Sequence, residues 1–252
     1  RHVIAADGMW SPTRKALGLA IDGYRGEWHA FRQYYRNVSP RASRELLIWF
    51  EKDLLPGYAW SFPLADGRAN IGFGIQRGGG RAVGAMNELW LDLLERPHIR
   101  DVLGPEAEPE GRHLAWPIPA RVGRVPLVGP STMFVGDAAA VTDPMTGEGI
   151  GQALLTVRLA AEAILHNINP EESYEREVRG ELVADDRMAR AMISLLGRPM
   201  IARGAIQLTG ATDWTRRNFA RWMFEDYPRA MIATPRRWHR GMFTGSGAFA
   251  AE

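Results

Sequence analysis

Apolar residues recur along the chain with two different periods, and this pattern predicts which segments are strands and which are helices. Short runs rich in branched and aromatic residues are typical of strands. Asp66-Gly67 separates two such runs and is a strong signal for a tight turn, so the runs on either side are expected to pair as a hairpin. Strands are predicted at 1–6, 28–38, 45–51, 58–64, 68–76, 112–118 and 133–135.

Helices are predicted where apolar residues return every three or four positions over a longer segment. The first begins near Ser11, which is a suitable N-cap, and Pro12 suits the first helical position. The helix expected at about 148–166 is apolar nearly all round, and such a helix is normally buried. Further helices are expected at 86–103 with an interruption at Pro97, at 171–196, and as two or three segments within 198–233.

The order of these elements predicts an α/β fold combined with α+β. A piece of α/β structure at 1–20 is followed by a β-rich antiparallel domain at 21–127 and by a second piece of α/β structure at 128–170. The two α/β pieces are expected to belong to one divided domain, and 171–252 to form a carboxyl-terminal helical region. Because the chain begins with Arg1 and enters an apolar run at once, we expect an amino-terminal segment to precede it.

Composition narrows the chemistry that the chain can support. Hydrophobic residues make up 46% and charged residues 24%, which is ordinary for a globular protein. The absence of cysteine excludes disulfides, zinc–thiolate sites and iron–sulfur clusters within the chain, and suits a cytoplasmic location. The 6 histidines show no metal-ligand spacing, so no metal site is predicted.

Basic charge is concentrated in the last part of the chain. Residues 198–252 contain 9 basic and 4 acidic side chains, whereas 1–197 contain 22 and 25. Only Lys15 and Lys52 are lysines, which argues against a nucleic-acid surface. We predict a basic amphipathic helix at 213–224 that contacts a membrane peripherally; the alternative is that this helix packs back on the β-rich domain. The residues concerned are Trp214, Phe219, Trp222 and Met223 with Arg216, Arg217 and Arg221.

The segment most informative about chemistry joins the strand at 133–135 to the helix that follows. The strand ends in Gly136-Asp137, and Gly147 and Gly149 lie in the loop that leads into the helix. Glycine lets a backbone approach a ligand closely, and a helix amino terminus offers unpaired N–H groups to an anion or an electron-rich ring. Because a carboxylate at this place can also accept from sugar hydroxyls, the segment suits a dinucleotide. The alternative is a plain strand–loop–helix connection with the aspartate as a cap.

Three strings of residues extend this observation. They are Ala6-Asp7-Gly8-Met9-Trp10-Ser11-Pro12-Thr13-Arg14, then Tyr58-x-Trp60-x-Phe62-Pro63 followed by Ala69-Asn70-Ile71-Gly72, and Gly136-Asp137-Ala138-Ala139 followed by Pro144 and Gly147-Glu148-Gly149-Ile150. Together they resemble the geranylgeranyl reductase family of FAD-dependent oxidoreductases, which have the para-hydroxybenzoate hydroxylase fold. The resemblance implies that 1–20 and 128–170 are parts of a Rossmann-like FAD-binding domain and that 21–127 is the substrate domain.

The resemblance also implies roles for individual residues. Asp137 would bond the ribityl chain of FAD, and the N–H groups of Gly149 and Ile150 would lie near the pyrimidine edge of the flavin. Tyr58, Trp60 and Phe62, which share one face of a strand, would floor an apolar substrate pocket; on their pattern alone, core packing is the alternative. The implied cofactor site comprises Asp7, Gly136, Asp137, Gly147, Gly149 and Ile150.

One motif of the family is absent from this sequence. The Gly-x-Gly-x-x-Gly turn that holds the FAD pyrophosphate does not follow any predicted strand, and we expect it in a segment before Arg1. The chain is therefore expected to contain only part of the cofactor site.

The activity implied is reduction of carbon–carbon double bonds in an isoprenoid or other apolar small molecule, with FAD as cofactor and NAD(P)H or another reductant as electron donor. The pattern identifies no catalytic residue. A flavin-dependent monooxygenase or halogenase is an alternative because these enzymes share both FAD motifs. An electron-transfer flavoprotein that reduces quinone is another, although the chain has no cysteine to hold an iron–sulfur cluster.

Overall fold

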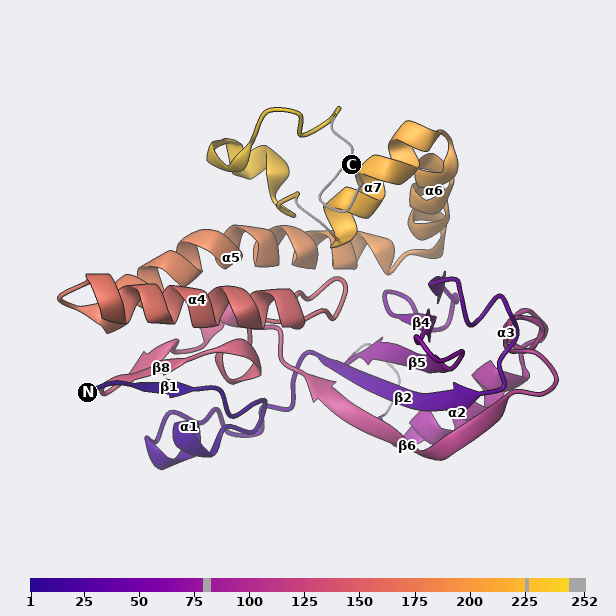
Figure 1. Ribbon diagram of the computed structural model, residues 1–252, viewed down its shortest axis with the longest axis horizontal. Coiled ribbons are helices and arrows are strands. Elements are labelled where there is room, and N and C mark those ends of the chain that lie inside the picture. Colours follow the sequence, from indigo (N-terminus) through magenta and orange to yellow (C-terminus); the bar gives the residue numbers. More distant parts are fainter. Residues whose placement is uncertain (79–82, 225–226, 245–252) are drawn as a thin grey trace. The chain divides into compact units, whose positions relative to one another are not determined.

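The computed structural model describes residues 1–78, 83–224 and 227–244 and divides into two compact units (Figure 1). Unit 1 consists of Arg1–Arg25 and Pro119–Glu252, and unit 2 of Gly26–Ile118. A parallel strand pair in unit 1 and an antiparallel sheet in unit 2 confirm the predicted combination of α/β with α+β. A separate helical region at 171–252 remains a prediction.

Unit 1 is built on a small sheet with the strand order β1-β8-β7. β1 (Val3–Ala5) runs parallel to β8 (Thr132–Phe134), and β7 (Val128–Gly129) runs antiparallel to β8. A parallel pair needs a long connection between its strands, and here the whole of unit 2 lies in that connection. The short helical elements of this part are α1 (Pro12–Ala16), η2 (Val122–Arg124) and η3 (Gly136–Ala139).

Two long helices pack beside this sheet. α4 (Ile150–His166) and α5 (Pro170–Leu196) form a helical hairpin (Figure 1). Tyr174 of α5 is completely buried and donates a hydrogen bond from its hydroxyl to the carbonyl oxygen of Phe134, and this burial raises the pKa of Tyr174. The core of unit 1 includes Met133, Phe134 and Val135 at β8, Leu159, Ala160 and Ala163 of α4, and Tyr174 and Val178 of α5.

The expectation that α4 is buried on all sides is wrong. Ile150, Leu154, Val157 and Leu165 are exposed, although the opposite side of the helix packs in the core. Because the helix is apolar on nearly all sides, its sequence does not show which side packs against other elements. Among the described residues, only one side of α4 is packed. None of the described helices is long and apolar enough to span a bilayer.

The chain after α5 forms further helices and then returns to α5. Ala230 donates its backbone N–H to Asp185 of α5 at 2.8 Å, and Arg237 pairs with the other oxygen of the same carboxylate at 3.0 Å. These contacts fasten the segment 230–237 to the middle of α5. The elements are α6 (Pro199–Gly210), α7 (Asp213–Phe224), η4 (Met231–Ala233) and η5 (Pro235–Arg237).

Unit 2 is an antiparallel sheet with strand order β3-β4-β5-β2-β6 and a helical layer on one face. The hairpin predicted at Asp66-Gly67 is confirmed, since β4 and β5 pair up to Pro63 opposite Ala69. The core between sheet and helices includes Phe31, Ile71, Phe73, Leu89 and Trp90. The elements are β2 (Trp28–Arg36), β3 (Leu47–Trp49), β4 (Tyr58–Pro63), β5 (Ala69–Gln76), η1 (Val83–Ala85), α2 (Met86–Glu95), α3 (Pro97–Leu103) and β6 (Glu108–Ile118).

β6 begins four residues earlier than the predicted strand at 112–118. Its first residues are polar and include Gly111, whose φ of +63° interrupts the regular register beside Arg32 and Tyr34 of β2. Gln33 closes this irregularity by donating from Nε2 to the carbonyl oxygen of Gly111 at 2.8 Å. The β pattern is hidden at this point because a bulge breaks the two-residue alternation.

Candidate functional site

The turn after β8 is shaped by close packing against α4. Gly136 has a φ of +57°, and a Cβ atom added to it would lie 3.3 Å from the Cβ of Ala153. Its N–H donates to the hydroxyl of Thr156, a side chain that is completely buried in α4. Gly136 therefore allows the turn to pack closely against α4, where a larger residue would be crowded.

Asp137 follows directly and lies beside the start of α4. Its Oδ1 accepts a hydrogen bond from the Thr142 hydroxyl at 3.3 Å, and a Cβ atom on Gly149 would lie 3.5 Å from the same oxygen. Burial raises the pKa of Asp137, partly offset by the Thr142 hydroxyl. The structure thus brings Asp137 and Gly149, two residues of the predicted site, next to each other.

The loop between this turn and α4 is closed by Asp143. The Oδ1 atom of Asp143 accepts from the N–H groups of Met145 and Thr146, at 2.7 and 3.0 Å. Its backbone N–H donates to the carbonyl of Glu148, and its carbonyl accepts from Gly147, both at 2.9 Å. Gly147 has a φ of +73°, a conformation that favours glycine. These bonds fix the loop directly before the first turn of α4.

The amino terminus of α4 is exposed and has no side-chain cap. Gly149 is its N-cap and forms no side-chain capping bond, and Ile150 and Gly151 in the first turn are exposed. The helix is 17 residues long, so its aligned peptide dipoles place partial positive charge at this end. An anion or an electron-rich ring can be stabilised here.

The turn at Asp7 supplies a second polar edge in the same unit. Oδ2 of Asp7 accepts from the N–H of Thr13 at 2.8 Å, and the Ser11 hydroxyl caps α1 by accepting from the N–H of Arg14 at 3.1 Å. Burial opposes ionisation, but hydrogen bonds from Ser11 and Thr13 outweigh it and hold the pKa of Asp7 below its ordinary value. The other oxygen, Oδ1, is buried without a partner among the described residues.

Arg14 connects the turn at Asp7 with the turn at Asp137. Its Nη2 donates to the carbonyls of Pro126 and Ala138, at 2.9 and 2.8 Å, and its guanidinium lies 3.9 Å from the centre of the Phe134 ring. Burial lowers the pKa of Arg14. Its Nη1 is buried and has no partner within the described chain.

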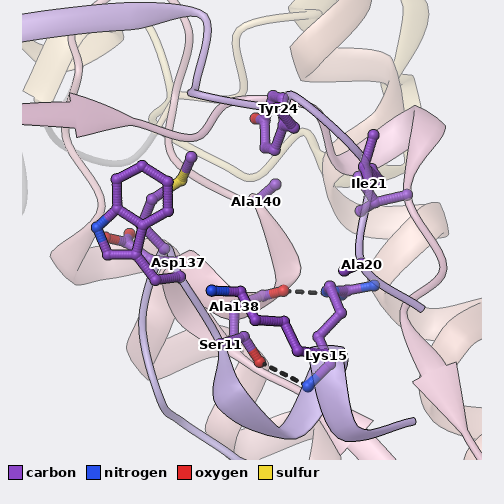
Figure 2. Close-up of a pocket in the computed structure, with 12 residues that line it drawn as sticks. Ser11, Lys15, Ala20, Ile21, Tyr24, Asp137, Ala138 and Ala140 are labelled. Carbon is purple, nitrogen blue, oxygen red and sulfur yellow. Dashed lines mark hydrogen bonds between the residues drawn. The ribbon is translucent and has the colours of Figure 1, made fainter. Parts of the chain in front are cut away.

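A small cavity lies where these two turns meet (Figure 2). Its volume is about 70 Å³, well below the roughly 300–1,000 Å³ of typical ligand pockets, so it can take only part of a dinucleotide. Figure 2 shows Asp137 and Ala138 on one side and Tyr24 and Lys15 on others. The unpartnered atoms of Asp7 and Arg14 and the open end of α4 fit the hydroxyls and negative charge of a dinucleotide such as FAD.

The three predicted substrate residues lie in unit 2, on the sheet face opposite α2 and α3. Tyr58 and Trp60 have ring centres 5.8 Å apart, and Trp60 stacks on Phe62 at the same separation. All three are half-buried, so none is sealed in the core. The ring of Trp60 covers Gly72, where an added Cβ would lie 2.3 Å from the indole. Their role as a substrate floor remains a prediction.

Sequence reasoning did not single out Thr142 and Thr156, which bind Asp137 and Gly136. A signal for Thr156 exists, because a hydroxyl in the middle of a nearly apolar helix has few uses other than bonding a neighbouring backbone group. No such sequence signal exists for Thr142, because its hydrogen bond to Asp137 forms only when the loop folds back.

Comparison with known proteins places these features among flavoenzymes. No family model matches the chain. It is 32% identical over 182 residues to digeranylgeranylglycerophospholipid reductase 1 of Methanopyrus kandleri, covering 69% of this chain and 45% of that protein. It is 35% identical over 179 residues to a menaquinone reductase of Mycolicibacterium smegmatis, covering 64% of this chain and 40% of that protein. The chain thus spans less than half the length of both relatives.

Solved structures show the same fold. A geranylgeranyl bacteriochlorophyll reductase-like protein from Thermoplasma acidophilum matches with a TM-score of 0.67 and 20% identity, over 94% of this chain and 62% of that one. CmlS, a flavin-dependent halogenase, matches with a TM-score of 0.56 and 20% identity, over 97% of this chain and 46% of that one.

Proposed function

Because the chain belongs to the geranylgeranyl reductase family of FAD-dependent oxidoreductases, we propose that the protein reduces carbon–carbon double bonds in an isoprenoid chain. The observation that carries this proposal is the similarity, above 30% identity, to reductases named for isoprenoid-containing molecules. The geometry of unit 1 supports it, because Asp137, Gly149 and the open end of α4 converge on one place.

The residues of unit 1 would bind and orient FAD, which supplies hydride-transfer chemistry when bound. Asp137 would accept hydrogen bonds from the sugar-like hydroxyls of the cofactor. The N–H groups at Gly149 and Ile150 would stabilise negative charge on the flavin through the dipole of α4. Arg14 and Asp7 each have one buried polar atom without a partner among the described residues, and we propose that the same ligand would supply these partners.

The open face of the sheet in unit 2 would bind the substrate. An isoprenoid chain offers almost no hydrogen-bonding groups, so it must be held by apolar contact. The aromatic ladder of Tyr58, Trp60 and Phe62 provides such a surface, and Leu114 and Trp116 on the same face are exposed. We propose NAD(P)H or another reductant as the electron donor.

An anaerobic assay with a chemical reductant tests this function. The purified protein, supplied with FAD and dithionite, is incubated with geranylgeranyl diphosphate, and the product is examined by mass spectrometry. Addition of hydrogen pairs to the chain without oxygen would support alkene reduction. A product that forms only in the presence of oxygen, hydroxylated or halogenated, would instead assign the protein to the oxygen-using enzymes that share its fold.

We also propose that the protein contacts a membrane peripherally, with α6 as the main contact. Met200, Gly204 and Leu208 follow each other at intervals of four and share one side of α6. Met200 is 88% and Leu208 69% exposed, whereas Ala202 on the other side is buried. Trp214, at the start of the neighbouring α7, is 53% exposed. Such an apolar side suits the boundary between lipid headgroups and acyl chains.

The basic residues predicted for this contact differ in their surroundings. Arg221 is only 3% exposed and lies over the ring of Tyr227 at 4.5 Å, so it supports the packing of the tail. Arg217 is exposed, and Arg216 is exposed while it pairs with Asp213. The electrostatic part of the proposed contact therefore rests on Arg216 and Arg217, with Arg203 on α6.

A further inference from the structure

Asp143, which closes the loop before α4, has a second oxygen that the loop itself does not use. Oδ1 accepts from the N–H groups of Met145 and Thr146, whereas Oδ2 accepts from Nε of Arg229 at 2.8 Å. Arg229 lies 86 residues further along the chain. The two side chains are only 7% and 10% exposed, so this ion pair is nearly sealed from water.

Arg229 is itself held in place by α7. Its Nη2 donates to the carbonyl of Met223 at 2.5 Å, and its guanidinium lies 5.6 Å from the centre of the Trp222 ring. The indole N–H of Trp222 donates back to the carbonyl of Arg229 at 3.3 Å. The next residue, Ala230, is bonded to Asp185 of α5. Arg229 thus joins the loop to α7, and its neighbour Ala230 joins the same segment to α5.

The pair has a consequence for the start of α4. A buried carboxylate is costly unless it is paired, so the loop keeps its closed form most easily when Arg229 is present. The loop leads directly into Gly149, the N-cap of α4, and Gly149 lies against Asp137. A chain of contacts therefore runs from the tail through Asp143 to the proposed cofactor site.

We propose that Arg229 is a positioning residue for the loop at 143–149 and that the carboxyl-terminal segment is thereby part of the cofactor site. It acts through Asp143 and sets the position of the amino terminus of α4. The identity of the cofactor as FAD rests on the proposed function, whereas the control of the loop by Arg229 does not.

Amide hydrogen exchange of the protein without cofactor tests the positioning directly. In Arg229→Ala the N–H groups of Met145 and Thr146 lose the fixed position of their acceptor, and we expect their exchange to be at least about tenfold faster. Arg237→Ala is the matched control, because Arg237 also fastens the tail to Asp185 but does not touch the loop. Unchanged exchange in a folded Arg229→Ala protein, or equal acceleration in Arg237→Ala, would overturn the proposal.

FAD affinity, measured by titration of flavin fluorescence, supplies the second readout. We expect Arg229→Ala to bind FAD at least about fivefold more weakly, with Arg237→Ala close to wild type. If Arg229→Ala does not fold, Arg229→Lys keeps the charge but loses the second hydrogen bond, and should show the same effects to a smaller extent. Faster exchange without any change in FAD affinity would reject the link between Arg229 and the cofactor site. The proposal of alkene reduction would not be affected, because the anaerobic assay tests it separately.

Discussion

Arg14 donates a hydrogen bond to the carbonyl oxygen of Ala138 at 2.8 Å and in this way joins two motifs that lie 124 residues apart. The same Nη2 atom reaches Pro126, and the guanidinium covers Phe134. The first motif thus holds the turn that carries Asp137, and this arrangement can be tested by substitution.

Arg14→Met should destabilise the protein while keeping much of the packing against Phe134. Two carbonyls lose their partner, and each unsatisfied buried group costs about 1–3 kcal/mol. We expect the free energy of unfolding to fall by about 2–4 kcal/mol in urea denaturation. Arg124→Met, an exposed arginine of the same unit, is the control and should change it by less than about 0.5 kcal/mol. Equal stability of the two variants would contradict the role of Arg14.

Asp137→Ala should lower the flavin content of the purified full-length protein. In the proposed function this carboxylate accepts from cofactor hydroxyls, and a hydrogen bond to a charged group contributes about 1.5–3 kcal/mol. The dissociation constant for FAD should rise about tenfold to hundredfold. Ser43→Ala, an exchange in unit 2, serves as control. An unchanged dissociation constant would remove Asp137 from the cofactor site.

Asp137→Asn should stabilise the protein at neutral pH when no cofactor is present. Burial raises the pKa of Asp137, so the folded state binds its proton more tightly than the unfolded chain does. Wild-type stability must then fall as the pH rises from the ordinary range of a carboxyl through the raised pKa. The amide avoids this loss, so without cofactor the variant should melt at a higher temperature at neutral pH, and the difference should shrink in acid. If the difference in melting temperature between the variant and wild type does not change with pH, the raised pKa of Asp137 is not its cause.

Gly72→Ala tests the packing of Trp60. An added Cβ would meet the indole at 2.3 Å and the carbonyl of Phe31 at 2.5 Å, whereas at Gly74, on the same strand and face, the nearest atom is 4.0 Å away. We expect Gly72→Ala to cost about 1–3 kcal/mol of unfolding free energy and Gly74→Ala to be nearly neutral. Thermal melting of the two variants makes the comparison, and equal melting temperatures would show that Trp60 does not occupy this position.

Charge on the outer side of α6 should release the protein from lipid. The double variant Met200→Asp, Leu208→Asp places two carboxylates where we propose the contact, and sedimentation with anionic vesicles should show at least about tenfold weaker binding. Leu165→Asp is the control because Leu165 on α4 has an exposure between those of Met200 and Leu208. Equal binding by all three proteins, or binding by none, would show that α6 does not contact the membrane.

Features encoded by adjacent residues, such as turns and helix starts, could be predicted from the sequence, whereas contacts between distant residues could not. Asp66-Gly67 specifies its hairpin because the turn is encoded in adjacent residues, and Ser11-Pro12 likewise specifies the start of α1. The motif around Asp137 places Asp137 and Gly149 in one predicted site, and the two residues are neighbours in the structure; that the site binds a cofactor stays a prediction.

Three features could not be read from the pattern, for physical reasons. The exposed side of α4 depends on which neighbours are present, not on the residues of the helix itself. The sequence suggests that Arg221 is a surface residue, but its side chain is buried because its guanidinium packs over the ring of Tyr227 in the tail. Arg229 and Asp143 are 86 residues apart and are brought together only by the folding of the tail, so no local sequence spacing predicts their ion pair.

The two ends of unit 2 are adjacent to each other. Glu27 donates its backbone N–H to the carbonyl of Ile118 at 3.0 Å, and Gly26 fits so closely there that a Cβ would lie 2.6 Å from the same oxygen. The chain therefore leaves unit 1 and re-enters it at nearly the same point, as an inserted cassette does. The segment from Gly26 to Ile118 can therefore be exchanged between related proteins, in evolution or by design, without re-routing the chain of unit 1.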